Sequence, residues 1–338
     1  MPLAHETWFL DQQNSYDWSF LTQTATLTLL AIAVLLTIVI RVVNRFWDGI
    51  DVPAVGNLAP WVSFAIRIHL AMSLLGLLSL GVFFSPAMDL QNNIIGVVLG
   101  AIMAITAVSM ATGFKVRYAA WLIVASGMLG MVEFGVPPIL QRIDLLGLAG
   151  FLIIAGGGRW SADAEAGERD LFDKDARLDD AGVRAMGIAM LLLRCAAGAA
   201  LIIVAGYEKL FNPQLALDFI VHYPDIQLAQ QIGIGLSDVQ YVRAVGAIEV
   251  LFGLLLISGA LPQVIILIAG VPFTATLWLF GVNELLGHLP IYGAMLAILI
   301  YGSHPQLRPT VYAFTSLFRG QPNQRSTRSF VSSSDGST

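Results

Sequence analysis

Two long apolar runs of this chain each contain a charged residue that could take part in chemistry. Arg194 and Glu249 each lie well inside a run long enough to cross a lipid bilayer. A charge at that depth is costly unless it is paired, and it marks a functional site by default. We therefore expect a buried Arg194–Glu249 pair that orients the polar part of a substrate. The alternative is a pair that only fixes the register of two helices.

A Glu, a His and a Tyr follow a helical spacing in the last apolar run. Glu284, His288 and Tyr292 are spaced by four residues, so they share one face of a helix. Such a line could bind a polar head group, relay protons or supply half of a metal site. The alternative is a capping carboxylate with an interfacial His and Tyr. Two ligands at this spacing are a weak metal signal, and we predict no metal site. The candidate catalytic residues are Glu249, Glu284 and His288.

Other polar residues are expected near the same membrane surface. Glu208 and Lys209 end one apolar run, and His222 and Tyr223 follow in the next loop. We expect these residues to converge with Glu284 and His288 in one outward-facing vestibule. The candidate substrate-binding residues are Arg194, Lys209, Glu249 and Tyr292. The secondary candidates are Glu208, His222, Tyr223, Arg67 and His69.

The composition indicates an all-α polytopic membrane protein. Of the 338 residues, 57% are apolar and 12% are charged, and the mean hydropathy is +0.75. Charged residues make up roughly a quarter of an ordinary soluble protein. The single cysteine, Cys195, excludes an internal disulfide, a thiolate-ligated cluster and a dithiol mechanism within this chain. We expect membrane lipids and other membrane or redox subunits as partners, and no nucleic acid.

The second half of the chain repeats the first. Residues 246–302 align without a gap on residues 100–156, and five of the eight glycines of the earlier segment recur. Near the start of the repeat, the sequence separation between aligned residues of the two copies is smaller by 19 residues. This difference indicates an insertion in the second copy. Glu249 aligns with Met103, so the first copy lacks this acid. The second copy is therefore the candidate site, and the first is the candidate scaffold.

Arg67 is the first-copy counterpart of Arg194, but no acid stands at the position aligned with Glu249. Either Arg67 reaches the cytoplasmic surface by snorkelling, or it uses an acid from elsewhere. His69 lies two residues further, near the opposite helix face. A lone His at this depth is more often a packing residue than a ligand.

The apolar runs predict nine transmembrane helices. One leading helix precedes two tandem four-helix bundles, and the even number of helices in each copy makes the copies parallel. The predicted parts are an N-terminal helix with its linker (1–58), a first repeat (59–158), a charged cytoplasmic linker (159–185), a second repeat (186–304) and a disordered cytoplasmic tail (305–338). The predicted spans are roughly 21–43, 61–84, 94–113, 117–134, 139–157, 186–207, 239–259, 262–280 and 285–303.

The Lys and Arg residues predict the orientation. With nine spans, most of them fall on one side, and the basic side of a membrane protein is the cytoplasmic side. We expect a multi-pass protein of a bacterial-type inner membrane, with its N-terminus outside and its C-terminus in the cytoplasm.

Two motifs of the second copy resemble a known family. AGYEKLFNP (205–213) and VGAIEVLFGLLLISG (245–259) resemble the DoxX/DoxD-like integral membrane proteins, and the resemblance covers about residues 188–303. The first copy is a degenerate version that keeps Arg67, Pro86 and the glycines but lacks the Lys and the Glu. The residues that match the family pattern are Arg194, Gly206, Lys209, Leu210, Pro213, Gly246, Glu249, Gly253, Leu255 and Leu256.

This resemblance implies a four-helix bundle in each copy and, as for some members, a role as the membrane subunit of a quinone-linked sulfur oxidoreductase such as thiosulfate:quinone oxidoreductase. A quinone would then be the cofactor. The leading function is thus an integral membrane component of a quinone-linked redox system. One alternative is a non-catalytic accessory or assembly subunit of a membrane complex, and another is a small-solute transporter. The sequence encodes no recognisable redox centre, so it leaves open whether the chain is an enzyme.

Overall fold

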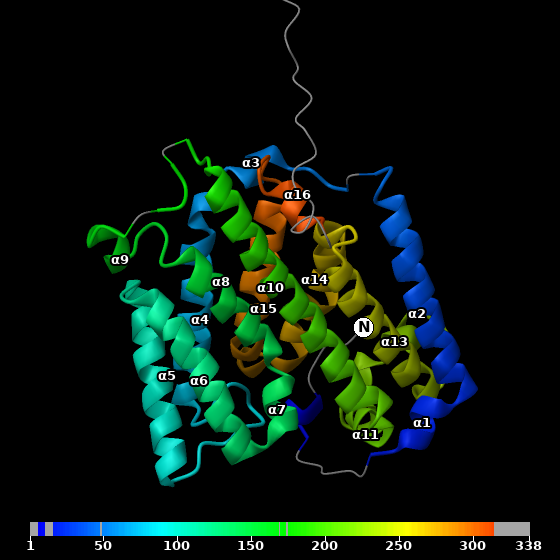
Figure 1. Ribbon diagram of the computed structural model, residues 1–338. Coiled ribbons are helices and arrows are strands. Elements are labelled where there is room, and N and C mark those ends of the chain that lie inside the picture. The colour runs from blue at the N-terminus through cyan, green and yellow to red at the C-terminus, as the bar shows by residue number, and fades with distance from the viewer. Residues whose placement is uncertain (1–5, 11–15, 48, 169, 174, 314–338) are drawn as a thin grey trace, which may run out of the picture.

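The computed structural model describes residues 6–10, 16–47, 49–168, 170–173 and 175–313 (Figure 1), and it confirms an all-α membrane protein. In this part of the chain the helices are joined by turns and loops, and no strand is present. Eight helices are long and apolar enough to cross a membrane. They are α2 (Thr24–Val43), α4 (Val62–Ser79), α5 (Ile94–Thr112), α6 (Val116–Phe134), α10 (Asp180–Val204), α13 (Asp238–Ser258), α14 (Pro262–Phe280) and α15 (Val282–Tyr301).

Several shorter helices lie at the two ends of the long ones, while α8 packs alongside α10 and α6. One end, the lower end in Figure 1, holds α1, α7 and α11, and we call it the α11 end. The other holds α3 and α16, and we call it the α16 end. The shorter helices are α1 (Trp18–Thr22), α3 (Pro53–Gly56), α7 (Val136–Leu140), α8 (Ile143–Ala155), α9 (Ala162–Glu165), α11 (Pro213–His222), α12 (Leu228–Gln231) and α16 (Arg308–Val311). The 3-10 turns are η1 (Glu6–Trp8), η2 (Ala59–Trp61) and η4 (Pro224–Ile226).

The fifth predicted span, residues 139–157, is wrong in its length. Residues 139–157 form the end of α7, a turn and the 13-residue helix α8. A helix of that length rises only about 20 Å, less than the roughly 30 Å of a bilayer core. Pro137 lies in the first turn of α7, where proline is tolerated, and Gln141 and Arg142 separate α7 from α8. Five apolar side chains of α8 are buried inside the protein instead: Leu145, Leu148, Ala149, Phe151 and Leu152.

The long helices pack in the same order in both halves of the chain. In the first half α4 contacts α5, α5 contacts α6, α6 contacts α8, and α8 contacts α4. In the second half α10, α13, α14 and α15 form the equivalent ring of contacts. The halves meet where α8 packs on α10 and α4 packs on α15. The shared contact order agrees with two repeats, while their parallel orientation and their division at 59–158 and 186–304 stay predictions.

The segment after α15 differs from the prediction of a disordered tail from residue 305. It contains α16, and Val311 is buried against the core. The predicted tail beyond residue 313 lies outside the described residues.

Two glycines bring the backbones of α10 and α13 into contact. A Cβ atom on Gly198 would lie 2.5 Å from the carbonyl oxygen of Gly253, and a Cβ atom on Gly253 would lie 2.5 Å from the carbonyl oxygen of Gly198. Small residues of this kind permit close helix packing in membranes, where van der Waals contact drives association. The crossing therefore holds together the two helices that carry the motif residues.

We predict that Gly198→Val destabilises the protein more than a glycine substitution in open space. Side-chain atoms at this crossing would push the two backbones apart, and overpacking of a core costs typically about 1–3 kcal/mol. The apparent melting temperature of the detergent-solubilised chain measures the effect. Gly235→Ala is the control, because a Cβ atom there meets nothing within 4 Å. Equal melting temperatures for the two variants would contradict the close contact.

Candidate functional site

Lys209 and Glu249, the Lys and Glu of the two motifs, form a buried ion pair. Lys209 Nζ lies 3.3 Å from Glu249 Oε1, and both side chains are 2% exposed. Lys209 lies on the π-helix η3 (Ala205–Leu210), which continues α10, and Glu249 lies on α13. Single π turns inside helices occur frequently at functional sites. Gly246, one turn before Glu249, leaves room for this approach, since a Cβ atom there would lie 3.4 Å from Lys209 Cβ.

A second carboxylate at Lys209, which could not be predicted from the sequence, comes from the N-terminal turn η1. Lys209 Nζ lies 2.9 Å from Glu6 Oε1 and 3.1 Å from Glu6 Oε2. Glu208 binds the same turn, because its carboxylate accepts hydrogen bonds from the Glu6 backbone N–H at 2.8 Å and from Thr7 Oγ1 at 2.7 Å. No spacing rule connects Glu6 with residues about 200 positions away, so the sequence carried no signal for this contact.

The charges of this cluster do not balance. Glu6, Glu208 and Glu249 are three buried carboxylates around one ammonium group, that of Lys209. Several buried ionised carboxylates with a single cation are costly, so part of the cluster binds protons instead. Burial raises the pKa of Glu6 well above its ordinary value; Lys209 opposes this shift and Glu208 adds to it. The cluster can therefore hold and release protons.

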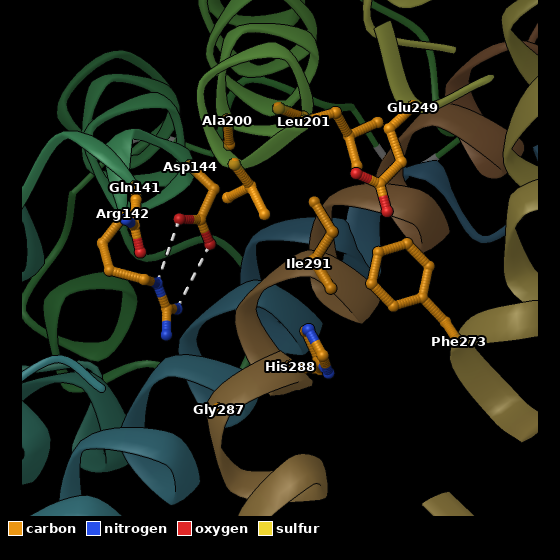
Figure 2. Close-up of a pocket in the computed structure, with 12 residues that line it drawn as sticks. Gln141, Arg142, Asp144, Ala200, Leu201, Glu249, Phe273, Gly287, His288 and Ile291 are labelled. Atoms are coloured by element: carbon orange, nitrogen blue, oxygen red, sulfur yellow. Dashed lines mark hydrogen bonds and ion pairs between the residues drawn. The ribbon is translucent and has the colours of Figure 1, made fainter. Parts of the chain in front are cut away.

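A pocket adjoins Glu249 between the two halves of the chain (Figure 2). Its volume is about 30 Å³, far below the roughly 300–1,000 Å³ of typical ligand sites. Glu249 Oε1 is paired with Lys209, whereas Glu249 Oε2 accepts no hydrogen bond from a described residue. The pocket thus presents a buried acceptor and has room only for water-sized molecules. Its polar lining residues are Gln141, Arg142, Asp144, Glu249 and His288.

On the opposite side of the pocket, the first half contributes an ion pair of its own. Arg142 Nε lies 3.2 Å from Asp144 Oδ1, and Arg142 Nη2 lies 3.3 Å from Asp144 Oδ2. Arg142 also donates to the Phe84 carbonyl at 2.8 Å. Both side chains are buried. The two buried ion pairs, Arg142–Asp144 and Lys209–Glu249, therefore flank the pocket from different halves, and the sequence analysis had not selected Arg142 or Asp144.

The predicted Glu–His–Tyr line is present on α15, but its members differ in surroundings. His288 Nδ1 lies 3.3 Å from Glu284 Oε1, and both side chains are buried. His288 faces the pocket and lies between aromatic rings, with ring centroids 5.0 Å from Trp8 and 4.9 Å from Phe273. The Tyr292 hydroxyl donates a hydrogen bond to the Phe273 backbone carbonyl at 2.9 Å. This bond joins α15 to α14, and Tyr292 does not line the pocket.

The predicted Arg194–Glu249 pair is wrong. Arg194 donates to the backbone carbonyls of Val311 and Ala313, after α15. It lies 15 residues before Lys209 in one continuous helical segment, a separation of about 22 Å along the axis. Because Glu249 contacts Lys209, it cannot also reach Arg194. The substrate-binding role predicted for Arg194 therefore lacks a connection to this site.

Arg67 makes the first-half version of the same contact. Its Nε donates to the Gly157 carbonyl at 2.9 Å, and its Nη2 donates to the Trp160 carbonyl at 2.8 Å. Arg67 is buried and binds backbone carbonyls, so neither predicted alternative holds: it neither reaches the surface nor pairs with an acid from elsewhere. His69 Nδ1 lies 2.7 Å from the carbonyl oxygen of Ala65, one helical turn earlier. Neither residue lines the pocket.

The predicted vestibule forms only in part. Glu208 and Lys209 join the cluster, and Tyr223 packs in an aromatic group with Phe219 at 5.0 Å between ring centroids. His222 is exposed, and its Nδ1 lies 2.8 Å from the carbonyl oxygen of Asp218. Among the described residues, no group of three or more His, Cys, Asp or Glu side chains could hold a metal ion.

Comparison with known proteins finds no family model, no curated protein and no solved structure that matches this chain. The site must therefore be interpreted from its own geometry.

We predict that Lys209→Met strongly destabilises the protein and that added Glu6→Gln and Glu249→Gln substitutions recover part of the loss. Removing one partner of a buried ion pair costs about 3–5 kcal/mol, because the other charge stays buried without compensation. Neutral glutamines remove that uncompensated charge. Apparent melting temperatures of the single, double and triple variants measure the effect.

Lys115→Met is the matched control, because Lys115 is an exposed lysine on the first half. A triple variant no more stable than Lys209→Met alone would refute the charge compensation.

Proposed function

We propose that this chain is the membrane-embedded component of a quinone-linked redox system that handles a small sulfur anion such as thiosulfate. In this proposal Lys209 and Glu249 bind the substrate and exchange protons with it. The observation that carries the proposal is the buried Lys209–Glu249 pair beside the pocket between the two halves. These are the same two residues through which the sequence resembles the DoxX/DoxD-like family.

The chemistry of the cluster supports this function. Lys209 offers a buried cation to an anionic substrate, and a buried cation in a dry site attracts an anion far more strongly than an exposed one does. A quinone takes up protons as it takes up electrons, and the surplus of carboxylates around Lys209 provides groups that hold protons. His288, on the other wall of the pocket, is a further group that can exchange a proton.

A transporter is the second candidate function. The pocket is lined by α8 from the first half and by α10, α13, α14 and α15 from the second. Carriers built from repeats place their substrate site at the repeat interface, which is where this pocket lies. The third function considered from the sequence, an accessory subunit, does not require the pocket to bind a substrate.

We predict that Glu249→Gln lowers thiosulfate-dependent quinone reduction about 10²-fold or more, as expected for loss of a proton-transferring group. The assay uses membranes of the native host, in which the full chain and its partner proteins are present, and follows reduction of a short-chain quinone. Met103→Leu is the control, because Met103 is the buried first-half counterpart of Glu249. Retained expression of the full-length variant separates loss of activity from loss of fold.

The three functions give different results in this experiment. Equal quinone reduction by Glu249→Gln and Met103→Leu membranes would sink the redox proposal. Thiosulfate uptake into proteoliposomes that Glu249→Gln abolishes would favour the transporter. Copurified redox subunits, together with full activity in Glu249→Gln membranes, would favour the accessory subunit.

A further inference from the structure

The N-terminal turn η1 (Glu6–Trp8) and the two residues after it cover the site at the α11 end. This short segment, residues 6–10, reaches both halves of the chain: Glu6 contacts Lys209, and Trp8 contacts Arg142 and His288. Glu6 and Trp8 are both buried. The segment therefore closes the cluster and the pocket together.

Trp8 fits into a notch on α15 that Gly287 creates. A Cβ atom on Gly287 would lie 2.3 Å from Trp8 Cζ3 and 2.5 Å from Trp8 Cη2, so the indole ring can lie there only because the residue is glycine. The Arg142 guanidinium lies 5.6 Å from the centre of the Trp8 ring, on the other side of the interface between the halves. Gly287, Arg142 and His288 all line the pocket, so Trp8 packs against the pocket lining.

Phe9 attaches the same segment to the second half. Its ring stacks on Phe280 with centroids 4.5 Å apart, and it lies 6.1 Å from Phe219 and 6.4 Å from Tyr223. These residues belong to the ends of α14 and α11 and to the loop that follows α11. Aromatic pairs of this kind contribute about 0.5–1.5 kcal/mol each beyond their buried area. The segment is thus held by several small contacts around one ion pair.

The Glu6 carboxylate occupies the position that an anionic ligand of Lys209 would take. Both of its oxygens lie within 3.1 Å of Lys209 Nζ, as the oxygens of a bound carboxylate or oxyanion would. Glu249 already supplies a carboxylate to the same ammonium group, so Glu6 is not needed to neutralise Lys209. The cavity that Glu6 and Lys209 themselves line has a volume of about 10 Å³, so with Glu6 in place it has no room for a substrate.

We propose that Lys209 is an anion-binding site that the chain's own Glu6 fills in this closed form, and that a small carboxylate or oxyanion enters by displacing Glu6 and the segment of residues 6–10. This inference rests on the proposed function, because it takes Lys209 as the residue that receives the substrate. Glu6 acts as an internal competitor, so binding of the anion and opening of the pocket are one event. The packing of Trp8 against Gly287 determines the equilibrium between the closed and the open form.

The test measures how fast a charged thiol reagent reaches the pocket in full-length protein in lipid nanodiscs. Ala200→Cys places a thiol in the pocket lining, and Cys195→Ser removes the native thiol. Gly287→Ala fills the notch of Trp8 and leaves Glu6 and Lys209 intact. Gly293→Ala on the same helix is the matched control, because a Cβ atom there makes an ordinary contact 3.4 Å from His69. Val221→Cys, at a position that is 74% exposed, reports that each variant is folded and reactive.

We predict that Gly287→Ala and Glu6→Gln each raise the labelling rate of Ala200→Cys about tenfold, which corresponds to about 1.4 kcal/mol in the closing equilibrium. Gly293→Ala leaves the rate unchanged. Millimolar thiosulfate or acetate raises the rate in the parent protein relative to sodium chloride of equal ionic strength, and neither anion raises it further in Glu6→Gln.

Two results would overturn the proposal. Labelling at the parent rate in both Gly287→Ala and Glu6→Gln, with Val221→Cys fully reactive, would show that residues 6–10 do not close the pocket. Opening by both substitutions with no response to either anion would show that Glu6 is not displaced by an anion. Failure of the proposed function is distinguishable, because it appears as normal quinone reduction in Glu249→Gln membranes whatever the labelling rates are.

Discussion

The cost of burying the Lys209 ammonium group organises the α11 end of this protein. An isolated ammonium group in a dry interior is unstable, so carboxylates must approach it from the surrounding elements. Glu249 comes from α13, while Glu6 comes from the N-terminal turn, which Glu208 anchors through its backbone. One cation thus joins three parts of the chain that are far apart in sequence. The close crossing of α10 and α13 at Gly198 and Gly253 holds the helical segments of Lys209 and Glu249 together.

The two halves share a packing order but differ in polarity at equivalent places. Buried Met103 occupies the position of Glu249 in the first half. The first half nevertheless contributes Arg142 and Asp144 to the pocket. The pocket is therefore asymmetric, with one ion pair from each half on helices that are not counterparts. The half that the sequence marks as scaffold supplies part of the wall, which a single four-helix bundle could not do.

Most of the fold could be predicted from the sequence, and part of the site could not. Long apolar runs bounded by glycine or charge predict α5, α6, α13 and α14 to within a few residues, because bilayer thickness fixes the length of such helices. The pairing of Arg194 failed because similar depth in two apolar runs does not determine which helix faces meet. Glu6 was missed because a short N-terminal turn has no periodicity, and its contact with Lys209 depends on tertiary packing alone.

The two buried arginines on α4 and α10 have a consequence for where each half ends. Arg67 holds the carbonyls of Gly157 and Trp160, and Arg194 holds those of Val311 and Ala313. Each guanidinium thus takes hydrogen-bond acceptors from the chain that follows the last helix of its own half, and Arg67 also donates to the Met110 carbonyl on α5 at 2.7 Å. A fragment cut directly after α15 would keep Arg194 and discard the carbonyls it binds. The smallest stable piece of the second half therefore extends at least to Ala313, about a dozen residues past the last long helix.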